Sequence, residues 1–128
     1  MKLLLDTHAL IWWLGSRQLI PQTVKDVLID GANDVYVSAA TAWEIATKQR
    51  IGKLRFDTAF LANFDASVAA LGFAPLPVNA MQMIAGAQIV SAHKDPFDRM
   101  LAGQALVDQM AVVTTDRAFT TLGVQVLW

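Results

Sequence analysis

The stretch Lys2-Leu3-Leu4-Leu5-Asp6-Thr7 contains an unbroken apolar run, Leu3 to Leu5, that is followed at once by a carboxylate, Asp6. An apolar run without alternation is typical of a strand that is buried on both faces, in the middle of a parallel sheet covered by helices. In open α/β sheets, ligands bind in the crevice beyond the carboxyl ends of the strands. We therefore expect Asp6 to form one wall of a functional site.

Strands and helices alternate along the rest of the chain. Short β-branched or apolar runs predict strands at residues 34–38, 73–78, 111–115 and 124–127. Apolar periodicity and capping residues predict helices at 8–14, 21–30, 39–51, 58–71, 80–90 and 96–110, a helical turn at 117–122 and a loop at 16–20. This order predicts a three-layer α/β/α fold with a mostly parallel central sheet. The strand at 73–78 contains prolines, which cannot donate backbone hydrogen bonds, so we expect it at an edge of the sheet.

Two expectations concern burial. Helix 80–90 is expected to bury the side chains of Met83, Ile84, Ala87 and Val90. Trp12 and Trp13 are adjacent on one predicted helix, so their side chains cannot both face the core in the same direction. We expect them to serve in the core or at an interface rather than as a platform for nucleobases.

The composition limits the possible classes of protein. A length of 128 residues predicts one domain, residues 1–128, and the absence of cysteine excludes disulfides and thiolate metal sites. The net charge of −1 excludes a strongly basic nucleic-acid-binding surface, although acids at a metal site would offset basic residues elsewhere. No stretch is apolar enough to span a bilayer, so we expect a cytoplasmic protein. The 55% hydrophobic content predicts that some apolar surface meets another chain, such as a second copy.

Four carboxylates stand out by position: Asp6, Glu44, Asp98 and Asp116. Each has a structural interpretation as well. Glu44 could simply pair with Lys48 one helical turn later, and Asp116 could cap the helical turn that follows it, as we expect Asp95 to cap helix 96–110. Asp98 lies in the first turn of that helix, where the helix dipole favours any acid. It also lies on the apolar face of the helix, where a carboxylate without a partner would be costly to bury.

Taken together, the four acids predict a metal site. If the strands that precede Asp6 and Asp116 are neighbours, both acids emerge at one sheet edge, where the helices bearing Glu44 and Asp98 can converge. Carboxylates about 5 Å apart repel by roughly 3 kcal/mol per pair at an effective dielectric near 20. Oxygen ligands without a thiolate select a hard ion such as Mg²⁺ or Mn²⁺, which suits hydrolysis of a phosphodiester.

The same residues carry a resemblance to a known family. The segments concerned are Leu4-Leu5-Asp6-Thr7-His8-Ala9-Leu10, Val37-Ser38-Ala39-Ala40-Thr41-Ala42-Trp43-Glu44-Ile45, His93-Lys94-Asp95-Pro96-Phe97-Asp98-Arg99-Met100-Leu101, Val113-Thr114-Thr115-Asp116 and Gly123-Val124-Gln125-Val126-Leu127-Trp128. In this order and combination they resemble a PIN-domain nuclease of the VapC toxin type. The resemblance covers nearly the whole chain.

The resemblance implies an activity and partners. Asp6, Glu44 and Asp98 match the metal-binding acids of the family, Asp116 matches its more variable fourth acid, and Thr114 matches a hydroxyl that often supports the site. The implied activity is metal-dependent cleavage of RNA by an endoribonuclease toxin, which a cognate antitoxin holds in check. The excess apolar surface is then assigned to a homodimer or to an antitoxin helix.

The residues leave other interpretations open. Lys48 and Arg99, close in sequence to the acids, are the preferred phosphate contacts, while His8 is expected to orient its loop. A receiver-type signalling domain also has an acidic pocket at strand ends, but it would need a second acid beside Asp6 and a phosphate acceptor at a central strand end. A haloacid-type phosphatase would need an aspartate where His8 stands. A non-catalytic PIN-like binding module is disfavoured because all four acids are present.

Overall fold

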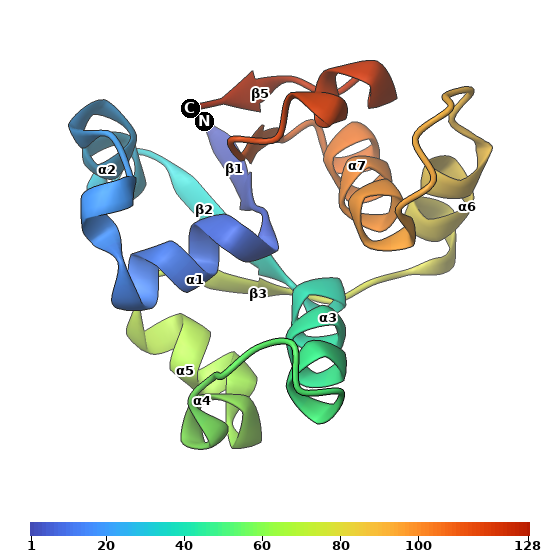
Figure 1. Ribbon diagram of the computed structural model, residues 1–128. Helices are drawn as coiled ribbons and strands as arrows, with labels where there is room; N and C mark the ends of the chain where they lie inside the picture. Colours follow the sequence, from blue (N-terminus) through green and yellow to red (C-terminus); the bar gives the residue numbers. More distant parts are fainter.

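A five-stranded, fully parallel sheet runs through the computed structural model, which describes residues 1–128 (Figure 1). The spatial order is β3-β2-β1-β4-β5. The bounds of the strands are β1 Lys2–Leu5, β2 Asp34–Ser38, β3 Ala74–Leu76, β4 Ala111–Val113 and β5 Val126–Leu127. The predicted three-layer α/β/α architecture with a mostly parallel sheet is confirmed, and the proline-containing strand β3 lies at an edge as expected.

Strand β1 is the centre of the sheet. Leu3, Leu4 and Leu5 are fully buried, and β1 is hydrogen-bonded to β2 on one side and to β4 on the other. Leu3 and Leu5 face one half of the core and Leu4 faces the other, which is the pattern of a strand covered on both faces. Because Leu5 is in register with both Val37 and Val113, the three strands end within one residue of the same level.

Helices form the two outer layers. Their bounds are α1 Thr7–Gly15, α2 Gln22–Ile29, α3 Ala39–Arg50, α4 Thr58–Ala62, α5 Phe64–Ala70, α6 Ala80–Gln88 and α7 Pro96–Asp108, with 3₁₀ helices η1 Arg17–Leu19 and η2 Arg117–Leu122. Figure 1 shows α1, α2, α4 and α5 on one side of the sheet and α6 and α7 on the other. Two predictions of extent were wrong: the helix expected at 58–71 is divided at Asn63, and the loop expected at 16–20 contains η1.

The prediction for the buried face of α6 was also wrong. Ile84 is 54% exposed and Val90 is fully exposed, whereas Gln82 and Gly86 are buried. The cause is a backbone-to-backbone approach between α6 and α7. A Cβ atom on Gly103 would lie only 2.1 Å from the carbonyl oxygen of Gln82 and 2.7 Å from the amide nitrogen of Gly86, so glycine alone allows this contact.

The buried polar residues between these helices satisfy one another. Gln104 accepts a hydrogen bond from the Ser38 hydroxyl (2.5 Å) and donates to the Pro77 carbonyl (3.1 Å). Gln82 donates to Asp108 over 2.7 Å. No helix of the protein combines the length and the apolar character needed to cross a membrane.

Candidate metal centre

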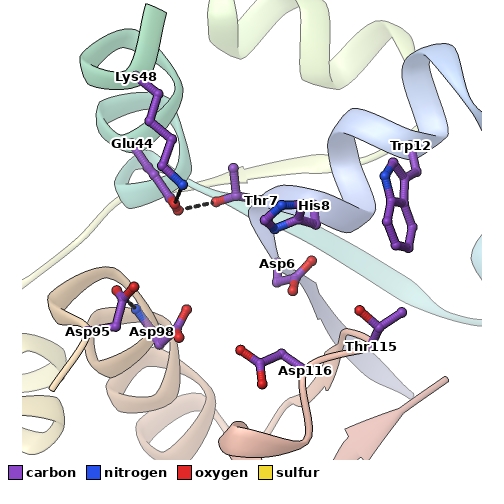
Figure 2. Close-up of a pocket in the computed structure, with 10 residues that line it drawn as sticks. All are labelled: Asp6, Thr7, His8, Trp12, Glu44, Lys48, Asp95, Asp98, Thr115 and Asp116. Atoms are coloured by element: carbon purple, nitrogen blue, oxygen red, sulfur yellow. Dashed lines mark hydrogen bonds and ion pairs between the residues drawn. The ribbon is translucent and has the colours of Figure 1, made fainter. Parts of the chain in front are cut away.

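The four predicted acids line one pocket at the carboxyl edge of the sheet. The cavity has a volume of ≈ 340 Å³ and ten lining residues (Figure 2). They are Asp6, Thr7, His8, Trp12, Glu44, Lys48, Asp95, Asp98, Thr115 and Asp116. Because the acids come from the ends of β1 and β4 and from helices α3 and α7, the fold brings distant parts of the sequence together here.

Asp6 is held in place by the end of its own strand. One carboxylate oxygen accepts a hydrogen bond from the Ala9 amide (2.7 Å), so Asp6 is the N-cap of α1, and the other accepts from the Thr114 hydroxyl. The residue is 6% exposed. Burial raises the pKa of the Asp6 carboxyl, and the nearby charge of Glu44 raises it further, against the lowering effect of the two hydrogen bonds.

Thr114 links two of the acids. Its hydroxyl donates to Asp6 and accepts a hydrogen bond from the Asp116 amide at 2.9 Å. Thr114 is almost completely buried, at 1% exposed. The Asp116 carboxylate caps η2 through the Ala118 amide (2.9 Å), as its structural interpretation predicted, and Asp116 also lines the pocket.

Glu44 has two close partners. Its Oε1 accepts a hydrogen bond from the Thr7 hydroxyl at 2.7 Å, and its Oε2 forms an ion pair with Lys48 Nζ at 2.6 Å. The i,i+4 pair that the sequence suggested therefore exists. Lys48 also lines the pocket, so the pair places a cation beside the other acids (Figure 2).

Asp98 faces the pocket from the first turn of α7. Its Oδ2 lies 2.7 Å from Nε2 of His93. Burial raises the pKa of Asp98 to about 6, and the charges of Asp95 and Asp116 add to this rise, while the contact with His93 opposes it. Asp95 caps α7 by accepting from the amides of Phe97 and Asp98, which confirms its predicted capping role.

Arg99 points away from the pocket. Its guanidinium donates four hydrogen bonds, to the backbone carbonyls of Gly86, Ile89, Ser91 and His93, over 2.7 to 3.1 Å. The structure thus gives Arg99 the function of holding the segment between α6 and α7, which carries His93. Of the two basic residues singled out in the sequence, only Lys48 lines the pocket.

Apart from the capping residue Asp95, the sequence did not single out four other residues of the pocket as site residues. Thr7 and Thr115 each follow an acid or hydroxyl at a strand end, and that position was the available signal. His8 and Trp12 are one helical turn apart on α1, which places them on the same face of that helix, and both line the pocket.

The donor set fits a hard divalent cation. In the present side-chain arrangement, no group of three or more Asp, Glu, His or Cys residues is gathered closely enough to hold a metal ion. The pocket nevertheless offers carboxylate oxygens from several elements, and mutual repulsion among the acids contributes to the raised pKa of both Asp6 and Asp98. A cation would offset that repulsion, and oxygen donors suit Mg²⁺ or Mn²⁺.

Comparison with known proteins gives a family match and several similar structures. The family model described as PIN domain matches residues 3–124. Among solved structures, VapBC2 from Rickettsia felis bound to a DNA fragment from its promoter has a TM-score of 0.72 at 12% identity, covering 99% of this chain and 98% of that one. FitAB bound to an IR36 DNA fragment has a TM-score of 0.65 at 25% identity, covering 98% and 93%.

A third solved structure, VapBC-1 from nontypeable Haemophilus influenzae, has a TM-score of 0.64 at 17% identity and covers 99% of this chain and 97% of that one. At identities this low, the VapBC structures establish the shared fold alone. No curated protein matches the sequence.

Proposed function

The chain belongs to the PIN domain family, and we propose on that basis that it is a metal-dependent endoribonuclease acting as the toxin of a toxin–antitoxin pair. The observation that carries this proposal is the convergence of Asp6, Glu44, Asp98 and Asp116 on one pocket at the carboxyl edge of the sheet. The likeness to VapBC and FitAB structures supports the toxin assignment. We place its action in the cytoplasm, where RNA is available.

The four carboxylates would hold a Mg²⁺ or Mn²⁺ ion. When bound, such an ion would supply positive charge for phosphoryl oxygens and would activate water for hydrolysis of a phosphodiester. Thr114 and the Ala9 amide fix both oxygens of Asp6, so the carboxylate is oriented before any ligand arrives. Thr7 fixes Glu44 in the same way. These contacts reduce the reorganisation needed to form the site.

Lys48 is the basic residue best placed to bind an RNA phosphate. Its ammonium group lies at the pocket, 2.6 Å from Glu44, on a side chain that is 37% exposed. If a cation were to neutralise Glu44, Lys48 would be free to donate to a phosphate oxygen instead. We retain Lys48 and not Arg99 as a phosphate contact, because the donors of Arg99 are occupied by backbone carbonyls.

Partner chains are proposed from the exposed apolar surface. A groove of ≈ 550 Å³ between α3 and α7 is lined almost entirely by apolar side chains, and Trp43 within it is 68% exposed. Patches of this kind mark interaction surfaces. We propose that a cognate antitoxin or a second copy of the chain covers this groove.

Changing Trp43 tests this assignment. In Trp43→Ser the groove loses its largest apolar side chain, so at least one of two assemblies should be lost. Light scattering measures the dimer, and calorimetric titration with the purified antitoxin measures the toxin–antitoxin complex. Retention of both assemblies would contradict the assignment. Leu19→Ser, which removes another exposed apolar side chain from η1, is the matched control.

The activity itself is tested by cleavage of RNA. Purified protein should cut cellular RNA with Mn²⁺ or Mg²⁺ and should not cut it with EDTA. Asp6→Asn keeps the shape of the side chain but removes its charge, and should lower the cleavage rate by at least about a hundredfold while the protein stays folded. Asp65→Asn, a change at an exposed acid on α5, should cleave normally.

Undiminished cleavage by Asp6→Asn, or cleavage in EDTA, would refute the proposal. A folded protein that binds its antitoxin and cuts no RNA would favour a non-catalytic PIN-like module. No observation favours the receiver interpretation, because Ser38 at the end of β2 is completely buried and hydrogen-bonded to Gln104.

A further inference from the structure

One wall of the acidic pocket is aromatic. Trp12 is the only hydrophobic residue among the ten that line the cavity. Figure 2 shows its indole beside His8, across the pocket from Lys48. The ring centroids of His8 and Trp12 are 6.2 Å apart with an angle of 66° between the planes, and Trp128 contacts the indole at 5.7 Å and 62°. Neither neighbouring ring is stacked parallel on the indole.

The adjacent tryptophans have different surroundings. Trp13 is 5% exposed, contacts Phe73 in the core at 5.7 Å, and is covered by the Arg17 guanidinium at 4.0 Å. Trp12 is only partly buried. Trp13 therefore supplies the core contact that the helix needs, whereas Trp12 leaves part of its ring at the pocket.

The ring nitrogens of His8 and Trp12 have no hydrogen-bond partner within the protein. No hydrogen bond involves the Trp12 indole N–H, and every buried side-chain nitrogen or oxygen in the protein has a partner, so this N–H is accessible to solvent. His8 is exposed, and its ring makes neither a hydrogen bond nor an ion pair. An aromatic surface with unused donors is suited to a flat, polar ligand.

We propose that His8 and Trp12 form a subsite for a nucleobase of the RNA, next to the phosphodiester that the acids engage. This inference rests on the proposed function and names what the pocket recognises: an unstacked base in a single strand or loop. Single-stranded RNA is bound by stacking of its bases on aromatic side chains, combined with cationic contacts to its backbone. Lys48 on the other side of the pocket offers the cationic contact.

The sequence expectation for Trp12 was a core or interface position. Trp13 lies in the core, and Trp12 packs against the core with part of its surface at the pocket, which is the part we assign to the subsite. A duplex cannot use the subsite without unpairing, because its bases are stacked on one another.

The test is binding of short oligonucleotides to a cleavage-inactive parent, Asp6→Asn, measured by fluorescence anisotropy with Mn²⁺ present. Two probes of equal length are compared: a single-stranded RNA with all its bases, and the same backbone with abasic residues at the centre. Adding Trp12→Leu should weaken binding of the base-bearing RNA about 5- to 100-fold, because stacking of one base is lost. Binding of the abasic probe should change less than twofold.

Two further variants keep the test decisive if Trp12→Leu does not fold. Trp12→Phe retains an aromatic ring and should bind the base-bearing RNA more tightly than a His8→Ala, Trp12→Phe double variant does. Asp65→Asn, at an exposed acid on α5 outside the pocket, should bind both probes as the parent does.

Equal affinity of Trp12→Leu and its parent for the base-bearing RNA would overturn the subsite, as would an equal loss for both probes. These results leave the proposed function intact if the wild-type protein cleaves RNA with Mn²⁺. Absence of that cleavage overturns the proposed function, whatever the probes show.

Discussion

Thr114 donates its hydroxyl hydrogen to the carboxylate of Asp6, 108 positions earlier in the chain. The two residues follow neighbouring strands, β4 and β1, whose ends are in register. The same hydroxyl accepts from the Asp116 amide, so one threonine fixes the spacing between two of the four acids. The pocket is therefore built from the centre of the sheet outward, with the helices bringing Glu44 and Asp98 to it.

The raised pKa of Asp98 predicts how stability depends on pH without metal. Between its ordinary value of 3.8 and about 6, the folded protein binds a proton at Asp98 that the unfolded chain has released. The free energy of unfolding should therefore fall as the pH rises through this window. Urea unfolding in EDTA at pH 4, 5, 6 and 7 measures this dependence.

The matched reference for that experiment is Asp98→Asn, whose side chain does not titrate. The wild-type stability minus that of the variant should decrease from pH 4 to pH 6 and then level off. A difference that stays constant or increases over this range would show that the pKa of Asp98 is not raised. Saturating Mn²⁺ should reverse the trend, because the ion binds the deprotonated carboxylate.

The Lys48→Met variant should gain more thermal stability from Mn²⁺ than the wild-type protein does. Glu44 is buried, and its only charged partner is Lys48, so the variant leaves a buried carboxylate without a counterion. The metal-free protein should melt at a lower temperature than wild type, and Mn²⁺ should raise the melting temperature of Lys48→Met by more than it raises that of wild type. Equal shifts would mean that Glu44 does not share the cation.

Arg99→Lys should weaken the segment between α6 and α7. A lysine ammonium cannot reach all four carbonyls that the guanidinium binds, so we expect the free energy of unfolding to fall by about 2 to 4 kcal/mol. Arg117→Lys, at an exposed arginine without a side-chain hydrogen bond, should change it by less than about 0.5 kcal/mol. Equal stability of the two variants would argue against this function of Arg99.

Gly103→Ala should separate α6 from α7. The added Cβ would lie 2.1 Å from the Gln82 carbonyl oxygen, and backbone atoms cannot move aside as a flexible side chain would. We expect a loss of about 3 kcal/mol or more in the free energy of unfolding. Gly15→Ala, where nothing lies within 4 Å of the new atom, should be close to neutral, and a similar loss there would refute the steric explanation.

The centre of the sheet and the placement of the acids were predictable from local patterns. Leu3-Leu4-Leu5 before Asp6 and Val112-Val113 before Thr114 each indicate a buried strand followed by a polar end, and parallel strands bring such ends together. The Asp95 cap was equally local, because an aspartate before a proline begins a helix.

The parts that failed depend on contacts between distant segments. Helix α6 has apolar residues at helical spacing, yet its inner face is set by the meeting of Gly86 with Gly103, which no local pattern shows. The carbonyls that bind Arg99 lie 6 to 13 residues away, at the end of α6 and in the irregular segment after it, so its guanidinium was not recognised as structural. Trp12 and Trp13 were indistinguishable in sequence, and only the packing of α1 separates them.

Binding of Mn²⁺ at the acidic pocket is the claim on which the rest depends, and isothermal titration calorimetry of metal-free protein at pH 7.5 measures it. We expect saturable binding to the wild-type protein and to Asp65→Asn, and at least a tenfold weaker binding to Asp6→Asn and Asp98→Asn. No binding to the wild-type protein at millimolar Mn²⁺, or binding that both pocket variants retain, would contradict the assignment of this pocket as a metal site.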